Sequence, residues 1–258
     1  MAQLFRRRSQ QNLPQGKHPA ETQVLPETMW ADEPMPSGIP PQGSVVVTIA
    51  RQFGSGGSEI GYMLAQESEL NYVDQAIIDE VARRLGVNVQ QVARWDEQTA
   101  GVVGHILEAI QSSNPFTVNY STLFGERRTP AQSRDLAYLC LTQKVVLEAA
   151  TQGNAVIVGR GSQFLLHNAP RTLHIYVFAP LPYRISSVMQ HFQLDHDQAE
   201  ALIEQHDYEH DMYLRHYYGT DGHQPGLYHL LINTSLFSFE MAANLIKQAL
   251  PLAKEIGA

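Results

Sequence analysis

The sequence predicts an α/β fold built on a doubly wound parallel sheet, with helices on both faces. Three observations lead to this prediction: short apolar runs rich in β-branched residues, helical spacing in the segments between those runs, and polar residues directly after several of them. Buried parallel strands are continuously apolar because helices cover both of their faces. The polar residues that follow such strands collect at one edge of the sheet, where ligands bind.

The clearest element is a strand, a glycine loop and a helix in succession. Residues 45–49 are mostly apolar and β-branched, residues 54–57 contain three glycines, and apolar residues then recur at helical spacing from 60 to 64. This order points backbone N–H groups and the positive end of a helix dipole at one place, which suits a phosphate. We therefore predict phosphate binding by Gly54, Ser55, Gly56 and Gly57. An ordinary glycine-rich turn between a strand and a helix is the alternative.

The loop departs from a complete P-loop where a lysine is expected. The pattern G-x-x-x-x-G-K-[ST] has a lysine after its last glycine, whereas this chain has Gly57 there and Ser58 next. The hydroxyl of Ser58 suits the position next to Mg²⁺, and it also suits a helix cap. Arg51, at the start of the loop, is placed either to reach a phosphate or to pair with a surface carboxylate. A branched side chain at Gly56 is expected to block the phosphate while leaving the protein folded.

Composition and charge narrow the classes of function. The 258 residues carry a net charge of −8, which argues against general binding of nucleic acid because such binding needs a basic surface. No apolar run approaches the roughly 18–20 residues of a membrane span, and the N-terminus lacks the apolar segment of a secretory signal. The single cysteine, Cys140, allows no disulfide within the chain, which fits a reducing cytoplasm.

The chain divides into two regions of different composition. Residues 1–43 are polar and rich in proline, and we expect a disordered tail because such a segment buries too little apolar surface to offset its ordering entropy. Residues 44–258 are expected to form one domain. Within it we expect further strands at 70–74, 155–158, 173–178 and 228–232, a mobile loop at 114–130, and helices at 77–85, 88–113, 133–152, 163–167, from 182 onward, 197–218 and 239–253.

Six segments carry a family resemblance: T-I-A-R-Q-F-G-S-G-G-S-E-I-G (48–61), Y-V-D-Q-A-I-I (72–78), V-I-V-G-R-G (156–161), V-F-A-P-L-P-Y-R (177–184), D-Y-E-H-D-M-Y-L-R-H-Y-Y-G (207–219) and Y-H-L-L-I-N-T (228–234). Through them, residues 45–250 resemble the cytidylate kinase-like family, a branch of the P-loop nucleoside monophosphate kinases. The resemblance implies a P-loop NTPase fold of the nucleoside monophosphate kinase-like type with a helical lid. It also implies transfer of the ATP γ-phosphate, with Mg²⁺, to a nucleoside monophosphate, with CMP or dCMP as the leading acceptor.

Three features distinguish this chain from the cytidylate kinases. The absence of the P-loop lysine is shared with the rest of this branch. The segment after Asp74 lacks the tyrosine–arginine pair that such kinases carry for the acceptor, and His210 stands where the branch usually has an arginine. A neutral histidine binds phosphate more weakly than the forked guanidinium of arginine.

The resemblance also assigns roles to residues at the strand ends. Phosphoryl transfer requires positioning and positive charge on the phosphate oxygens, so Arg160, Arg184 and Arg215 are predicted to be catalytic. Arg160, between two glycines, is also the predicted ligand of the acceptor phosphate, with a structural salt bridge as its alternative. Asp74 is expected to bind the acceptor ribose or a water on Mg²⁺, or else to cap the helix that follows. Arg184 has the weaker case because arginines on helices are usually solvated.

The predicted lid helix at 197–218 carries charged residues on one face. Asp207, Asp211 and Arg215 are four residues apart, and the alternative to a lid is a plain solvated face on which they would form ion pairs along the helix. Arg215 is the cation there that is placed to swing onto the phosphates. His206 and His210 share the same spacing, which suits two metal ligands, but no third ligand is evident in the sequence.

Three classes of function remain from the sequence. The first is an active nucleotide kinase, and the second is a nucleotide-binding sensor or regulatory pseudo-kinase, which Gly57 in the lysine position favours. The third is an α/β interaction protein whose loop binds nothing. We expect nucleotides as partners, neither nucleic acid nor membrane, and a cytoplasmic location.

Overall fold

The structure is a computed structural model that describes residues 37–74 and 130–256, apart from the side chains of residues 130–138, 140 and 141. Four expectations lie outside the described residues: the tail before residue 37, the helices at 77–85 and 88–113, and the loop before Pro130. The environment of the Cys140 side chain also lies outside them.

The core of the fold is a parallel sheet of five strands in the order β2-β3-β1-β4-β5. The strands are β1 (Val46–Arg51), β2 (Asn71–Val73), β3 (Ala155–Val158), β4 (Thr172–Phe178) and β5 (Leu230–Asn233). β1 lies at the centre, where it pairs with β3 on one side and with β4 on the other. Its β-branched residues are buried because both faces of the sheet are covered. The predicted doubly wound parallel sheet is confirmed.

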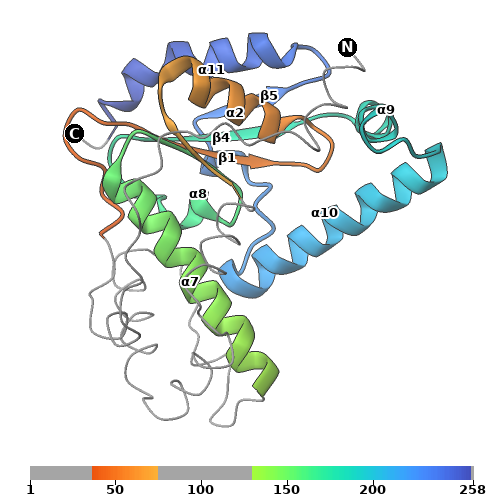
Figure 1. Ribbon diagram of the computed structural model, residues 1–258, viewed down its shortest axis with the longest axis horizontal. Helices are drawn as coiled ribbons and strands as arrows, with labels where there is room; N and C mark the ends of the chain where they lie inside the picture. Colours follow the sequence, from red (N-terminus) through yellow and green to blue (C-terminus); the bar gives the residue numbers. More distant parts are fainter. Residues whose placement is uncertain (1–36, 75–129, 257–258) are drawn as a thin grey trace, which may run out of the picture. The chain divides into compact units, whose positions relative to one another are not determined.

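Helices cover the two faces of this sheet (Figure 1). α2 (Gly57–Ser68) and α11 (Phe239–Ala253) lie on one face, where Ile60, Leu64 and Ile246 are fully buried with the strand residues. α7 (Pro130–Gln152) and the short α8 (Ser162–Leu165) lie on the other face. Both sides of β1 are therefore buried within the described residues.

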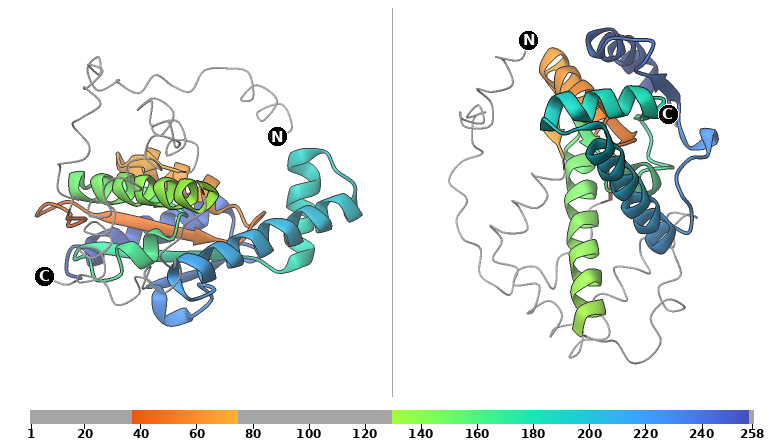
Figure 2. Two further views of the ribbon diagram at one scale, coloured as in Figure 1. Left: turned by 90° about the horizontal axis from the view of Figure 1, so that it is seen from below. Right: turned by 90° about the vertical axis from the view of Figure 1, so that its right-hand side faces the viewer.

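Two further helices follow β4 and contact each other; in Figure 1 the first is seen along its axis and the second lies across the view, and Figure 2 shows the same pair from two other sides. They are α9 (Leu181–Phe192) and α10 (His196–Tyr218), and a short 3-10 turn, η1 (Pro225–Leu227), follows. A capping box between Asp195 and Gln198 starts α10, and Gly219 ends it in a left-handed conformation. The last turn of α10 returns to the body of the protein, because Leu214 and Tyr218 are buried beside α8. α10 spans the residues for which the sequence predicted a lid helix.

Residues 37–43 differ from the expectation of a disordered tail. The N–H of Gly38 donates a hydrogen bond to Thr151 Oγ1 of α7 at 3.0 Å, and the guanidinium of Arg171 donates to the carbonyl of Pro40. Gly38 also packs so closely on Leu147 that a Cβ there would be 2.6 Å from its methyl group. The folded body therefore begins before residue 44. The sequence does not predict this start of the folded body, because backbone groups of residues 37–43 make the contacts and the segment has no apolar pattern.

None of the helices in residues 37–74 and 130–256 is both long enough and apolar enough to cross a membrane.

Candidate functional site

The glycine loop between β1 and α2 is held from beneath by Ser55. Its side chain is fully buried, and its hydroxyl lies 2.8 Å from the carbonyl of Gln52 and 3.2 Å from that of Val177. Its backbone N–H donates to the Gln52 carbonyl at 3.3 Å, and Thr234 Oγ1 donates to its carbonyl at 2.8 Å. Ser55 therefore anchors the loop to the sheet, and its N–H group is already engaged. The phosphate donors that we predicted are better supplied by the residues around it.

The first turn of α2 follows directly from Gly56, which has a φ of 83°. No side chain in the described part of the chain caps this helix start, so the N–H groups of its first turn are open to an anion. A Cβ built at Gly56 would overlap the ring of Phe239 on α11. The expectation that a branched residue at Gly56 leaves the fold intact is therefore wrong, because the clash involves a residue packed on the core.

Arg51, the last residue of β1, extends along the carboxyl edge of the sheet toward β3. A Cβ built at Gly57 would lie 2.5 Å from the Cβ of Arg51, and one built at Gly159 would overlap its Nη1. Burial lowers the pKa of the guanidinium, and the nearby Arg160 lowers it further, while Tyr72 and Asp74 oppose the shift. Arg51, Arg160 and Asp74 thus come from three strand ends and meet at one place, as the sequence predicted for the sheet edge.

The G-R-G segment after β3 is a tight left-handed turn. Gly159, Arg160 and Gly161 have φ values of 79°, 58° and 66°, and this region is unfavourable for an arginine. α10 holds the turn in place, since Tyr218 donates a hydrogen bond to the carbonyl of Arg160 at 3.3 Å. The guanidinium carbon of Arg160 lies 5.9 Å from the ring centroid of Tyr213, also on α10. α10 therefore fixes the backbone and borders the side chain of Arg160.

Arg184 is buried, contrary to the expectation for an arginine on a helix. Its Nη1 lies 2.6 Å from Oδ2 of Asp207 and 3.2 Å from the carbonyl of Phe53 in the loop. Asp207 Oδ1 in turn accepts a hydrogen bond from the N–H of Phe53 at 3.3 Å. Arg184 thus joins α9, α10 and the glycine loop through Nη1, while its buried Nε has no hydrogen-bond partner within the described residues.

The ion pairs along α10 that a plain solvated face would give are not the ones that the structure shows. Asp207 pairs with Arg184, as above, and Asp211 Oδ1 lies 3.1 Å from His223 Nε2. Arg215 pairs with Asp221 through Nη2 and Oδ2 at 3.4 Å. Each charged residue of the face finds a partner outside the helix because α10 is packed between α9 and the segment that follows Tyr218. Arg215 is 60% exposed at its side chain, so it is bound only loosely.

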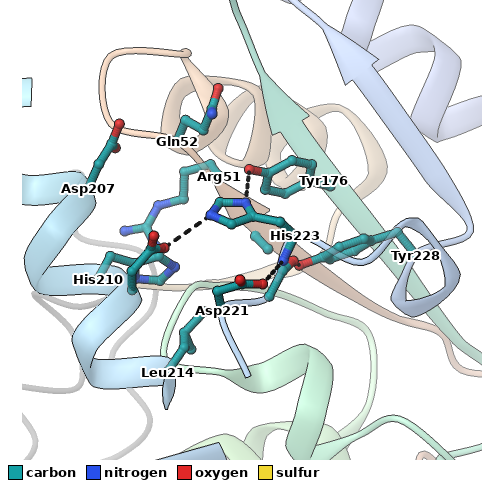
Figure 3. A pocket seen from close by; sticks show the side chains of 12 residues that line it. Arg51, Gln52, Tyr176, Asp207, His210, Leu214, Asp221, His223 and Tyr228 are labelled. Atoms are coloured by element: carbon teal, nitrogen blue, oxygen red, sulfur yellow. Dashed lines mark hydrogen bonds and ion pairs between the residues drawn. The ribbon is translucent and has the colours of Figure 1, made fainter. Parts of the chain in front are cut away.

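A pocket of about 120 Å³ opens beside Arg51, between the sheet edge and α10 (Figure 3). Its volume is below the roughly 300 Å³ at which sites for whole ligands begin, so the described residues enclose room for a single phosphate or hydroxyl group. Burial and then the neighbouring Arg51 lower the pKa of His210 to about 4, which leaves a neutral imidazole at neutral pH. The lining residues are Ala50, Arg51, Gln52, Tyr176, Asp207, His210, Asp211, Leu214, Asp221, Gly222, His223 and Tyr228.

The family model for the cytidylate kinase-like family matches residues 46–236. The chain belongs to the cytidylate kinase-like family. A cytidylate kinase of Methanocaldococcus jannaschii is 25% identical over 215 residues, which cover 82% of this chain and all of that one. A cytidylate kinase of Pyrococcus horikoshii is 22% identical, over 84% of this chain and 94% of its own. A solved structure of an uncharacterized protein from Eubacterium ventriosum has a TM-score of 0.56 at 17% identity, covering 81% of this chain and 98% of that chain.

The predicted site residues of this cytidylate kinase-like protein fall into two groups. Arg51, Gly57, Ser58, Asp74 and Arg160 lie at the carboxyl edge of the sheet or at the start of α2. Tyr72 lies there too, and its hydroxyl donates to the carbonyl of Ser58 at 3.2 Å. Arg184 and Arg215 lie on α9 and α10 instead, and both are bound to aspartates. No group of three His, Cys, Asp or Glu residues within the described ranges is arranged to hold a metal ion, and His206 stacks on Phe53 with ring centroids 4.2 Å apart.

Sequence reasoning missed the hydrogen-bonded chain that closes the far side of the pocket. His223 contacts Asp211 through Nε2 and the hydroxyl of Tyr176 through Nδ1, both at 3.1 Å. Burial, followed by Asp207 and Asp211, raises the pKa of Tyr176 to about 12. The T-D-G-H turn at 220–223 is the available signal, because Asp and Gly in succession indicate a turn. The contact of His223 with Tyr176 of β4 depends on tertiary packing, so the sequence pattern does not predict it.

Proposed function

We propose that this protein is a nucleotide kinase that transfers the γ-phosphate of ATP to a nucleoside monophosphate, with CMP or dCMP as the leading acceptor. The observation that carries the proposal is the uncapped start of α2 beside two arginines, Arg51 and Arg160, at the carboxyl edge of a parallel sheet. An open helix start attracts anions, and the family of the chain agrees with this reading.

In the proposed site the donor and acceptor phosphates meet above the sheet edge. The backbone of Gly54, Gly56, Gly57 and Ser58 would receive the phosphates of ATP, with Ser55 anchoring the loop beneath them. The hydroxyl of Ser58 would contact the Mg²⁺ that accompanies ATP. Arg160 would hold the phosphate of the acceptor, and Asp74 its ribose or a water on the metal ion. Arg184 would act by positioning the loop and the lid, since its Nη1 binds both Asp207 and the carbonyl of Phe53.

The reaction needs little covalent participation by the protein. An oxygen of the acceptor phosphate attacks the γ-phosphorus of ATP, the bond to the β-phosphate oxygen breaks, and ADP leaves with the electron pair of that bond. Catalysis consists of alignment and of positive charge on the transferring oxygens. Arg215 is the lid cation held most loosely, so it is the one proposed to turn toward the phosphates when the lid closes.

The test combines calorimetry with a coupled assay for ADP release. Purified full-length protein is titrated with ATP and Mg²⁺, and ADP release is followed with CMP, dCMP, UMP, AMP and GMP as acceptors. Stimulation by CMP or dCMP above the other three supports the proposal. Binding of ATP without any stimulated release supports a nucleotide-binding sensor, the alternative that Gly57 in the lysine position favours. Absence of ATP binding overturns both.

A further inference from the structure

Two positions of the P-loop pattern are changed together in this chain. The pattern G-x-x-x-x-G-K-[ST] begins with a glycine and places a lysine after its last glycine. When Gly56 is aligned with the last glycine, Arg51 occupies the first glycine position and Gly57 occupies the lysine position. The small residue and the cation have therefore exchanged places within one loop.

The structure shows that these two changes depend on each other. The stem of Arg51 passes over Gly57, so that a Cβ at residue 57 would lie 2.5 Å from the Cβ and 3.0 Å from the Cγ of Arg51. A lysine at position 57 has no room while Arg51 is present. The guanidinium then reaches Gly159, where a Cβ would overlap Nη1. Two glycines about 100 positions apart in the sequence thus make space for one arginine.

The guanidinium of Arg51 borders the pocket and forms no hydrogen bond or ion pair within the described residues. Tyr72 and the carboxylates of Asp74 and Glu59 raise its pKa, while burial and Arg160 lower it, and the net shift is downward. The neutral imidazole of His210 faces it across the pocket (Figure 3). Burying a cation without a partner is unfavourable, and a bound anion would remove this cost.

We propose that Arg51 supplies the positive charge that a lysine supplies in an ordinary P-loop, by binding phosphate oxygens of the nucleotide held in the loop. The proposal rests on the nucleotide binding proposed above. Arg51 lies between the start of α2, which would hold the donor phosphates, and Arg160, which would hold the acceptor. Its planar fork can contact two oxygens at once, which an ammonium group cannot do in the same geometry. Gly57 and Gly159 keep the space that this side chain needs.

The first experiment measures ATP affinity and turnover in the full chain. Arg51→Ala is expected to weaken binding of ATP with Mg²⁺ at least about tenfold, the range for loss of a charged hydrogen bond, and Arg51→Lys is expected to recover part of it. The matched control is Lys247→Ala, which removes an exposed cation that pairs with Glu67 at the far end of α2. Circular dichroism checks that each variant is folded. Equal ATP affinity and equal turnover in wild type and Arg51→Ala would overturn the proposal.

The second experiment tests the exchange of positions without relying on the ligand alone. Gly57→Ala is expected to lower the unfolding midpoint because its Cβ meets Arg51, and the added change Arg51→Gly is expected to relieve that loss. The double variant Arg51→Gly/Gly57→Lys, which restores the ordinary pattern, is expected to bind ATP more tightly than either single variant. Additive effects on stability and on ATP binding would refute the coupling. If wild type binds no ATP, both this proposal and the proposed function fail. If wild type binds ATP independently of residue 51, only this proposal fails.

Discussion

Arg184 Nη1 lies 2.6 Å from Asp207 Oδ2, and this pair joins α9 to α10 directly above the glycine loop. The arginine side chain is only 8% exposed, while the aspartate is 33% exposed. Both also bind the backbone of Phe53, through its carbonyl and its N–H. The Arg184–Asp207 pair therefore connects both helices to the glycine loop.

Replacing Asp207 with asparagine is expected to destabilise the protein, because Arg184 would remain buried without a carboxylate. Removing one partner of a fully buried ion pair lowers the free energy of unfolding by about 3–5 kcal/mol. Because Asp207 is partly exposed, we expect a loss of about 3 kcal/mol or less for this pair. Urea denaturation followed by circular dichroism measures the change. Glu204→Gln, an exposed carboxylate of the same helix, is the control and should change stability little. Equal effects of the two variants would contradict the assigned role.

Acid is expected to destabilise the fold through His174. Burial, then His229 and His167, lower the pKa of its imidazole to about 3, while the unfolded chain titrates near the ordinary value of about 6.5. Between these values the unfolded state binds more protons, so stability rises with pH and is lost as pH falls from about 6.5 toward 3. The slope from one such proton is at most about 1.4 kcal/mol per pH unit.

The measurement is the free energy of unfolding between pH 4 and pH 8 for wild type and His174→Gln. The glutamine variant should show the shallower slope, although it loses the contact of His174 Nδ1 with Thr48 Oγ1 at 2.7 Å. Burial lowers the pKa of His210 to about 4. The His174→Gln variant should therefore still lose some stability as pH falls, because His210 remains in it. His196→Asn, at an exposed position, should retain the wild-type slope. Parallel curves for wild type and His174→Gln would rule out this source of the acid sensitivity.

Two truncated chains test the contribution of residues 37–43. A chain that begins at residue 44 is expected to unfold at a lower temperature than one that begins at residue 37, because it loses the contacts of Gly38 with Thr151 and Leu147 and that of Pro40 with Arg171. A loss of about 1–2 kcal/mol corresponds to several degrees in a domain of this size. Calorimetric unfolding compares the two. Identical midpoints would show that these contacts contribute nothing to stability.

Arg160 offers a test of the acceptor side of the proposed reaction. Asparagine is the suitable replacement because it tolerates the left-handed conformation, with a φ of 58°, better than alanine does. Arg160→Asn is expected to lower turnover by about 10³, as for loss of an arginine that stabilises transferring phosphate, and to weaken binding of the monophosphate. ATP affinity should change little. The readouts are the coupled ADP-release assay and calorimetry with each nucleotide, and unchanged turnover would remove Arg160 from the reaction.

Local patterns account for the parts of the fold that were predicted. The apolar runs located the strands to within two residues, and the helical spacing located Phe239–Ala253 at its observed bounds. The rule that strand ends share an edge brought Arg51, Asp74 and Arg160 together. The partner of Arg184 was not predictable, because Asp207 lies 23 residues away and their contact depends on how α9 and α10 pack. The same reason hides the contact of His223 with Tyr176, 47 residues apart.

The stacking of Phe53 on His206, at 4.2 Å between ring centroids, adds a second contact between the loop and α10, and it has a thermodynamic consequence. A molecule that changes the backbone conformation at Phe53 must therefore also change the relative free energies of the positions that α10 can adopt. Linkage is reciprocal, so a factor that moves α10 changes the affinity of the loop by the same ratio. A fluorescent reporter on the exposed side of α10 would therefore respond to occupancy of a loop that it never touches.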